Sequence, residues 1–121
     1  MAEILVFEDH VRSQEIIQRI LERAGHKLFG TFVDHFGDID NAITKAVAAG
    51  VKVAIVDGRL IGGGERDGAV IAIKLRRAGI TSIAHATDHN EEMGADIVVG
   101  KVASSAALLN AVAQALGSFV R

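Results

Sequence analysis

Three carboxylate residues come directly after apolar stretches of the sequence. Glu8 and Asp9 follow Ile4–Phe7, and Asp57 follows Val51–Val56. Clustered carboxylates repel one another and therefore favour a bound cation. Mg²⁺ suits such a cluster because it prefers oxygen ligands and often uses only one or two carboxylates, together with phosphate oxygens and water. If the two apolar stretches are neighbouring strands, these residues predict a magnesium site.

A lysine completes a set of groups that suits phosphoryl transfer. Lys101 follows the apolar run Ile97–Val99 and Gly100. A carboxylate, a divalent cation and an ammonium group in one pocket can position a phosphoryl group and offset its negative charge. A single charged residue at the end of a strand more often caps the next helix. The joint placement of Asp9, Asp57 and Lys101 favours a site over three separate caps.

The rest of the chain alternates apolar runs with amphipathic segments. Such alternation is typical of a parallel sheet with helices on both faces. Strands are expected at Ile4–Phe7, Lys27–Val33, Val51–Val56, Ile80–Ala86 and Ile97–Val99. Helices are expected over the apolar positions from Ile16 to Ala24 with Gly25 as the stop, from the cap Asp38 to Gly50, from Asp67 to Gly79, and from Ser104 or Ser105 to Gly117. The second strand is the least apolar and is expected at an edge.

These elements predict one doubly wound α/β domain over residues 1–121, with the flavodoxin-like strand order 2-1-3-4-5. Ligands of such sheets bind beyond the strand ends where the order reverses, here between the first and third strands. That point would bring Glu8, Asp9 and Asp57 together. Only six residues separate Thr87 from Gly94, a helical rise of about 9 Å. The fourth helix is therefore expected to be a single turn or a loop.

Composition excludes several classes of protein. Half of the 121 residues are apolar, so a disordered chain is excluded. Without cysteine there is no disulfide, no thiol nucleophile and no cysteine-bound zinc. A net charge of −2 gives no reason to expect nucleic acid or an acidic membrane as a direct partner. No signal peptide or membrane-spanning run is found, so a cytoplasmic protein is expected.

Other site motifs fail. The first strand–helix turn lacks the glycines of the dinucleotide fingerprint, and Gly62–Gly68 lacks the Gly-Lys-Ser/Thr ending of a Walker loop. That glycine-rich stretch is better interpreted as a flexible insertion beside the site. The five histidines show no metal-ligand spacing on one element, although His10 and His89 are expected at the pocket rim. Ser13 has no evident base partner, which argues against Ser-His-Asp chemistry.

The sequence resembles the receiver domain of two-component response regulators. The resemblance rests on Leu5–Asp9, Ile55–Asp57, Asp67–Gly68 and Lys101, and it covers nearly the whole chain. It implies a (βα)5 domain that accepts a phosphoryl group from a histidine kinase or a phosphotransfer protein. Such a domain is no enzyme in the usual sense, because it catalyses only its own phosphorylation and dephosphorylation. The short fourth helix is similar to a subset of bacterial receivers in which that helix is degenerate.

The resemblance also implies a role for each matched residue. Asp57 matches the phosphoacceptor, Asp9 the direct Mg²⁺ ligand, and Glu8 the acidic residue that holds a metal-bound water. Arg59, two residues after the acceptor, would give its backbone carbonyl to the metal. Lys101 matches the lysine that pairs with the phosphoryl oxygens.

Three departures from the family concern its switching residues. The family has Ser or Thr at the end of the fourth strand, where this sequence has Ala86 or, after a shift of one residue, Thr87. The fifth strand, Ile97–Val99, lacks the usual aromatic switch residue. Val102 replaces the proline that usually follows the lysine in a cis peptide bond. A non-proline cis bond costs about 2.5–4 kcal/mol, so a trans bond is expected after Lys101.

Two functions remain open at this point. The first is a phosphoaccepting receiver that relays phosphate or binds a downstream protein partner, with a homodimer left open. The second is an interaction module whose receiver fold no longer switches, which Ala86, the absent switch aromatic and the short fourth helix favour. The joint presence of Glu8, Asp9, Asp57 and Lys101 favours the first. A metal-dependent phosphatase acting on small molecules is a distant third.

Overall fold

The computed structural model describes residues 2–56, 60–64, 67–86, 94–100 and 105–117. The strands are β1 (Glu3–Phe7), β2 (Lys27–Leu28), β3 (Val53–Val56), β4 (Thr81–Ala86) and β5 (Ile97–Gly100). The helices are α1 (Val11–Arg23), α2 (Ile39–Ala48), α3 (Asp67–Arg77) and α4 (Ser105–Gly117), with a short 3-10 helix η1 (Phe36–Asp38) before α2. The single turn or loop predicted between Thr87 and Gly94, in place of a further helix, falls on residues 87–93, which lie outside the described residues.

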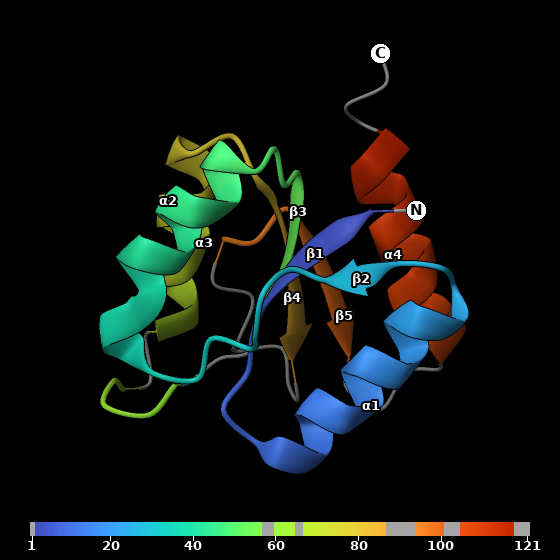
Figure 1. Ribbon diagram of the computed structural model, residues 1–121, viewed down its shortest axis with the longest axis horizontal. Helices are drawn as coiled ribbons and strands as arrows, with labels where there is room; N and C mark the ends of the chain where they lie inside the picture. Colours follow the sequence, from blue (N-terminus) through green and yellow to red (C-terminus); the bar gives the residue numbers. More distant parts are fainter. Residues whose placement is uncertain (1, 57–59, 65–66, 87–93, 101–104, 118–121) are drawn as a thin grey trace.

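All five strands pair in parallel in the order β2-β1-β3-β4-β5. Helices α2 and α3 cover one face of the sheet, and α1 and α4 cover the other (Figure 1). The predicted doubly wound parallel sheet and its strand order are therefore confirmed. Among the described residues, no helix is long and apolar enough to cross a membrane.

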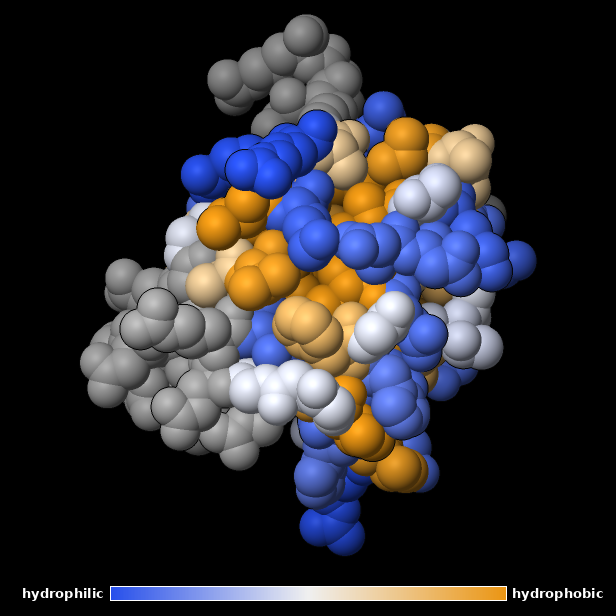
Figure 2. Space-filling model, turned by 90° about the vertical axis from the view of Figure 1, so that its left-hand side faces the viewer, coloured by the Kyte–Doolittle hydropathy of each residue, from blue (hydrophilic) through white to orange (hydrophobic). Residues whose placement is uncertain are grey.

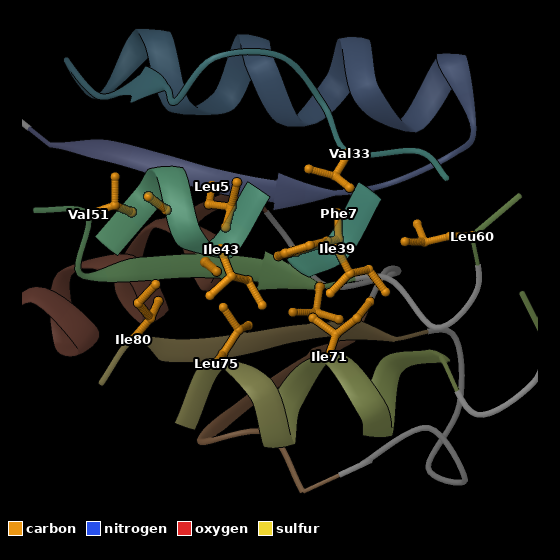
Figure 3. Packing of buried hydrophobic residues seen from close by; sticks show 13 residues of the cluster. Leu5, Phe7, Val33, Ile39, Ile43, Val51, Leu60, Ile71, Leu75 and Ile80 are labelled. Atoms are coloured by element: carbon orange, nitrogen blue, oxygen red, sulfur yellow. The ribbon is translucent and has the colours of Figure 1, made fainter. Parts of the chain in front are cut away.

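Each face of the sheet builds its own hydrophobic cluster, because successive side chains of a strand point to opposite faces. Leu5 and Phe7 of β1 face α2 and α3, where they meet Ile43 and Ile71 (Figure 3). The other cluster, towards α1 and α4, includes Ile4, Val6, Ile17, Leu21, Val53, Ile55, Ile83, Val99, Leu108 and Val112. The central strands β1 and β3 are thus buried on both faces, as their continuous apolar runs indicate.

The surface over α2 and α3 mixes apolar and charged side chains (Figure 2). Val47 of α2 and Ile73 of α3 are about half exposed, at 49% and 53%. Lys74 of α3 reaches across to Asp40 of α2, with 2.7 Å between its ammonium nitrogen and a carboxylate oxygen. This ion pair joins the two helices on the solvent side, while the apolar cluster joins them to the sheet.

The second strand is much shorter than the predicted Lys27–Val33. Gly30 has a φ of +62°, a left-handed conformation that interrupts the extended chain. The segment returns to the sheet at Val33, which pairs with Phe7 in an isolated parallel bridge. The predicted edge position of this strand is confirmed. The third strand is also shorter than predicted, because Val51 closes the end of α2 by donating its N–H to the Ala46 carbonyl at 2.9 Å.

Three helix ends and one helix start show which capping predictions are correct. Gly25, Gly50 and Gly79 follow α1, α2 and α3 with φ between +78° and +81°, so they end these helices as predicted. Asp38 precedes α2, but its side chain makes no capping hydrogen bond. The 3-10 turn Phe36–Asp38 leads directly into α2 instead, so the predicted side-chain cap is wrong.

Candidate functional site

The candidate site lies at the carboxyl edge, the edge of the sheet formed by the chain just beyond Phe7, Val56, Ala86 and Gly100. The strand register makes Phe7 the partner of Val56, so β1 and β3 end level with each other. Glu8 and Asp9 follow Phe7 directly, and position 57 follows Val56. The acidic pair therefore begins directly beyond the level at which β1 and β3 end together.

Glu8 is fully buried, with 0% of its surface exposed. One of its carboxylate oxygens, Oε2, accepts the backbone N–H of His10 at 3.2 Å. The Glu8 N–H donates to the Val33 carbonyl at 2.9 Å, and the Glu8 carbonyl accepts the side-chain amide of Gln14 at 2.8 Å. Helix α1 begins at Val11, and a carboxylate is favoured near a helix N-terminus. Hydrogen bonds to Val33, to the His10 amide and to the Gln14 side chain of α1 thus hold Glu8 in place.

Asp9 differs from Glu8 because its side chain is partly exposed. Adjacent carboxylates, one buried and one reaching solvent, form a hard oxygen donor set of the kind that Mg²⁺ prefers. Glu8 and Asp9 therefore fit the predicted metal site. The neighbouring His10 is exposed, and its backbone amide already serves Glu8.

The other predicted site residues, Asp57, Arg59, Thr87, Lys101 and His89, lie outside the described residues. The strand register still places the residues directly before Thr87 and Lys101. Ala86 is the last residue of β4 and pairs with Gly100, the last residue of β5. Strands β4 and β5 thus end level with each other, and residue 101 follows β5 in the sequence. The choice between Ala86 and Thr87 for the switch position stays open.

The loop after β3 is anchored at Leu60 and Ile61, directly before Gly62–Gly68, and the flexible insertion expected over that stretch stays a prediction. The Leu60 side chain is 2% exposed. The Ile61 N–H donates to the Asp34 carbonyl, and the Ile61 carbonyl accepts the Phe36 N–H, both at 2.8 Å. These partners come from the β2–α2 connection, which is distant in the sequence.

Asp67 is a site-bordering residue whose role sequence reasoning missed. Its carboxylate is 3% exposed and accepts the backbone N–H groups of Leu60 and Gly64, each at 2.8 Å. The prediction that a helix opens at Asp67 is correct. The available signal was an aspartate at the start of an apolar helical pattern, which usually indicates a cap. Here the side chain binds the preceding loop.

A second group of metal-ligand type lies in the β2–α2 connection. Asp34, His35 and Asp38 each offer a ligand atom, and these atoms lie within 4.8 Å of one another. The ring nitrogen Nδ1 of His35 lies 2.8 Å from a carboxylate oxygen of Asp34. This hydrogen bond, helped by the charges of Asp34 and Asp38, raises the pKa of His35. Sequence reasoning set this histidine aside because no other histidine is near it.

Solved structures identify the architecture. No protein-family model matches the sequence, and no curated protein matches it significantly. The signal receiver domain of a modulated diguanylate cyclase from Desulfovibrio desulfuricans superposes with a TM-score of 0.78 at 17% identity, covering 98% of this chain and 95% of that one. A response regulator receiver protein from Burkholderia phymatum gives 0.75 at 15% identity, covering 97% and 96%.

A response regulator receiver domain protein from Clostridium thermocellum gives a TM-score of 0.71 at 18% identity, covering 98% of this chain and 96% of that one. The chain has the receiver fold. The resemblance predicted from the sequence is therefore confirmed for the architecture. In this receiver fold, Glu8 and Asp9 lie where the central strands β1 and β3 end together.

Proposed function

We propose that this chain is a two-component receiver that accepts a phosphoryl group on Asp57 from the phosphohistidine of a histidine kinase or phosphotransfer protein. The observation that carries the proposal is the register of β1 and β3, which pairs Phe7 with Val56. Position 57 therefore follows β3 at the level where the Glu8–Asp9 pair begins. The receiver fold shared with signal receiver domains supports the same function.

The proposed reaction is an in-line transfer. An Asp57 carboxylate oxygen forms a bond to phosphorus while the bond from phosphorus to the donor imidazole nitrogen breaks, and its electron pair returns to the imidazole. The Lys101 ammonium pairs with the phosphoryl oxygens. If Thr87 fills the switch position, its hydroxyl contacts the phosphoryl group. If Ala86 fills it, no side-chain hydroxyl makes this contact. Hydrolysis of the acyl phosphate later restores the Asp57 carboxylate.

Mg²⁺ is the cofactor that the acidic residues fit. Asp9, Asp57 and the Arg59 carbonyl would hold it, and Glu8 would hold one of its waters. When bound, it supplies positive charge that offsets the charge on the phosphoryl oxygens. Glu8 suits an indirect role because it is buried and fixed by the His10 amide. Asp9 suits a direct role because its side chain reaches solvent.

The output of this receiver is proposed to be a protein contact, with a cognate kinase upstream and a binding partner downstream. The runner-up is a receiver-fold module that no longer switches. One observation favours it: β4 ends on Ala86 and β5 consists of Ile97, two valines and Gly100, so neither described strand contributes a switch hydroxyl or aromatic ring. Comparing amide NMR spectra with and without beryllofluoride plus Mg²⁺ separates the two, because a non-switching module would show no changes beyond the site.

The direct test is labelling by acetyl phosphate in the presence of Mg²⁺. We expect the wild type to be labelled, Asp57→Asn to lose all labelling, and chelation of Mg²⁺ to have the same effect. Asp40→Asn is the matched control, because Asp40 is an exposed residue of α2 that pairs with Lys74. It should be labelled like the wild type. Full labelling of Asp57→Asn would overturn the proposal.

A further inference from the structure

The loop between β3 and α3 is fastened to the first residue of α3. Both carboxylate oxygens of Asp67 are used: Oδ2 accepts the Leu60 N–H and Oδ1 accepts the Gly64 N–H, each at 2.8 Å. Hydrogen bonds to a charged acceptor are about twice as strong as neutral ones. With only 3% of Asp67 exposed, little water competes for them. Asp67 therefore holds both ends of the Leu60–Gly64 segment.

Leu60 is also fixed through its side chain. It is 2% exposed and belongs to the cluster that contains Phe7 and Ile71 (Figure 3). Next to it, Ile61 exchanges backbone hydrogen bonds with Asp34 and Phe36. The chain is thus anchored at Val56 by the sheet and again at Leu60, with only three residues between these anchors.

Gly63 is adapted to the Asp67 carboxylate. A side-chain carbon built on Gly63 would collide with both oxygens of that carboxylate. Its φ is not left-handed, so the need for glycine here is one of space. The backbone at Gly63 therefore lies so close to the Asp67 carboxylate that no side chain fits between them.

We propose that Asp67 is a positioning residue for the phosphoacceptor segment, residues 57–59; this inference rests on the proposed function. Asp67 does not touch the phosphoryl group. It acts through the Leu60 amide, which sets one end of the short segment that carries the acceptor Asp57 and the Arg59 carbonyl. Its hydrogen bonds set the affinity for Mg²⁺ and the rate of phosphorylation beyond any effect on folding.

The test variant is Asp67→Asn, which keeps the shape of the side chain but replaces one acceptor oxygen by an amide NH₂ group. That group cannot accept a backbone N–H, so one of the two contacts is lost. We expect Mg²⁺ affinity, measured by amide NMR titration without a phosphodonor, to fall about tenfold. The rate of labelling by acetyl phosphate should fall by a similar factor. Asp40→Asn, the exposed control, should change neither.

Gly63→Ala tests the same contact from the other side, because it displaces the carboxylate without removing it. It should lower Mg²⁺ affinity in the same direction, and the double variant should be no weaker than the weaker single variant. If Asp67→Asn does not fold, Gly63→Ala decides alone. Should the folded variants bind Mg²⁺ as the wild type does and merely melt earlier, the positioning role is refuted.

The two proposals fail in different ways. A wild type that binds Mg²⁺ but is never labelled on Asp57 would refute the phosphoacceptor function, while the Mg²⁺ titration would still decide the role of Asp67. A labelled wild type whose Mg²⁺ affinity and rate are matched by Asp67→Asn would refute only the role of Asp67. A wild type that binds no Mg²⁺ would refute both.

Discussion

The β1–β3 half of the carboxyl edge and the β4–β5 half carry different kinds of side chain. The first half presents Glu8, Asp9 and the Asp67 carboxylate, of which Glu8 and Asp67 are buried. In the second half, β4 ends on Ala86, and β5 offers the aliphatic residues Val98 and Val99. The acidic residues that the proposed phosphoryl transfer uses therefore belong to the first half, whereas Lys101 and the departures from the receiver pattern belong to the second.

This difference shows that the proposed acceptance of a phosphoryl group and the proposed contact with a protein partner can be tested separately. The acidic residues of the first half are fixed by backbone hydrogen bonds, such as those from His10 to Glu8 and from Leu60 to Asp67. In the second half, Val98 is 46% exposed and Val99 is 8% exposed. Neither position carries an aromatic ring. The proposed contact with a protein partner would therefore use other side chains.

The largest expected effect comes from removing a core side chain of the first half. Phe7 is fully buried beside the site, so Phe7→Ala should lower the free energy of unfolding by about 3–5 kcal/mol. Val98→Ala, at a half-exposed position of the second half, should change it by less than about 0.5 kcal/mol. Urea unfolding of both variants measures this contrast. Equal losses would show that the two halves are not packed as differently as described.

The next effect concerns the metal. Asp9→Asn should weaken Mg²⁺ binding on the order of 100-fold, because it removes a charged oxygen ligand. Ala86→Thr, which adds a hydroxyl to the second half, should change the rate of labelling by less than about fivefold, the value of one modest hydrogen bond. Calorimetric Mg²⁺ titration and labelling rates check the pair. A larger effect of Ala86→Thr than of Asp9→Asn would reverse the assignment of the two halves.

The smallest effects are pH-dependent and belong to two histidines, His26 directly before β2 and His35 in the β2–α2 connection. Hydrogen bonding to Asp34 raises the pKa of His35 above its usual 6.5. Its stabilising effect is therefore full below 6.5 and is lost as the pH rises through the higher folded pKa. Burial, helped by the N-terminal charge, lowers the pKa of His26, whose Nδ1 accepts the Ala2 N–H at 3.2 Å.

The contribution of His26 is consequently present above 6.5 and is lost as the pH falls through its lower folded pKa. The two contributions are lost on opposite sides of 6.5, so the share of the stability that comes from these two histidines should be greatest near that pH. NMR titration of the imidazole signals should give a midpoint above 6.5 for His35 and below it for His26. Asp34→Asn should bring the His35 midpoint back towards 6.5 and leave His26 unchanged. An unchanged His35 midpoint would contradict the assigned hydrogen bond.

Sequence reasoning predicts the architecture well because its signals are local. Continuous apolar runs mark strands buried on both faces, and their alternation with helices indicates a parallel sheet. The observed order 2-1-3-4-5 is that of the flavodoxin-like fold. Gly25, Gly50 and Gly79 mark helix ends because only glycine adopts their left-handed conformation without strain. The same conformation at Gly30 cuts the second strand short. The sequence does not predict this, because a glycine in an apolar run does not reveal its φ.

The parts that could not be predicted depend on contacts between distant segments. The loop after β3 contains three consecutive glycines, and the sequence does not show that Ile61, just before them, pairs with Asp34 and Phe36 of another connection. Asp67 reads as a helix cap, yet its carboxylate binds the loop that precedes it. The acidic pair Glu8–Asp9 could be predicted as a site, because the carboxyl ends of parallel strands meet at one edge.

The most direct test of the central claim is to map the phosphorylated residue. The protein is incubated with acetyl phosphate and Mg²⁺, the acyl phosphate is reduced with borohydride, and the peptides are sequenced by mass spectrometry. The account predicts one modified residue per chain, at Asp57, and none in the absence of Mg²⁺. Modification at Glu8, Asp9 or a histidine, with Asp57 unmodified, would contradict it.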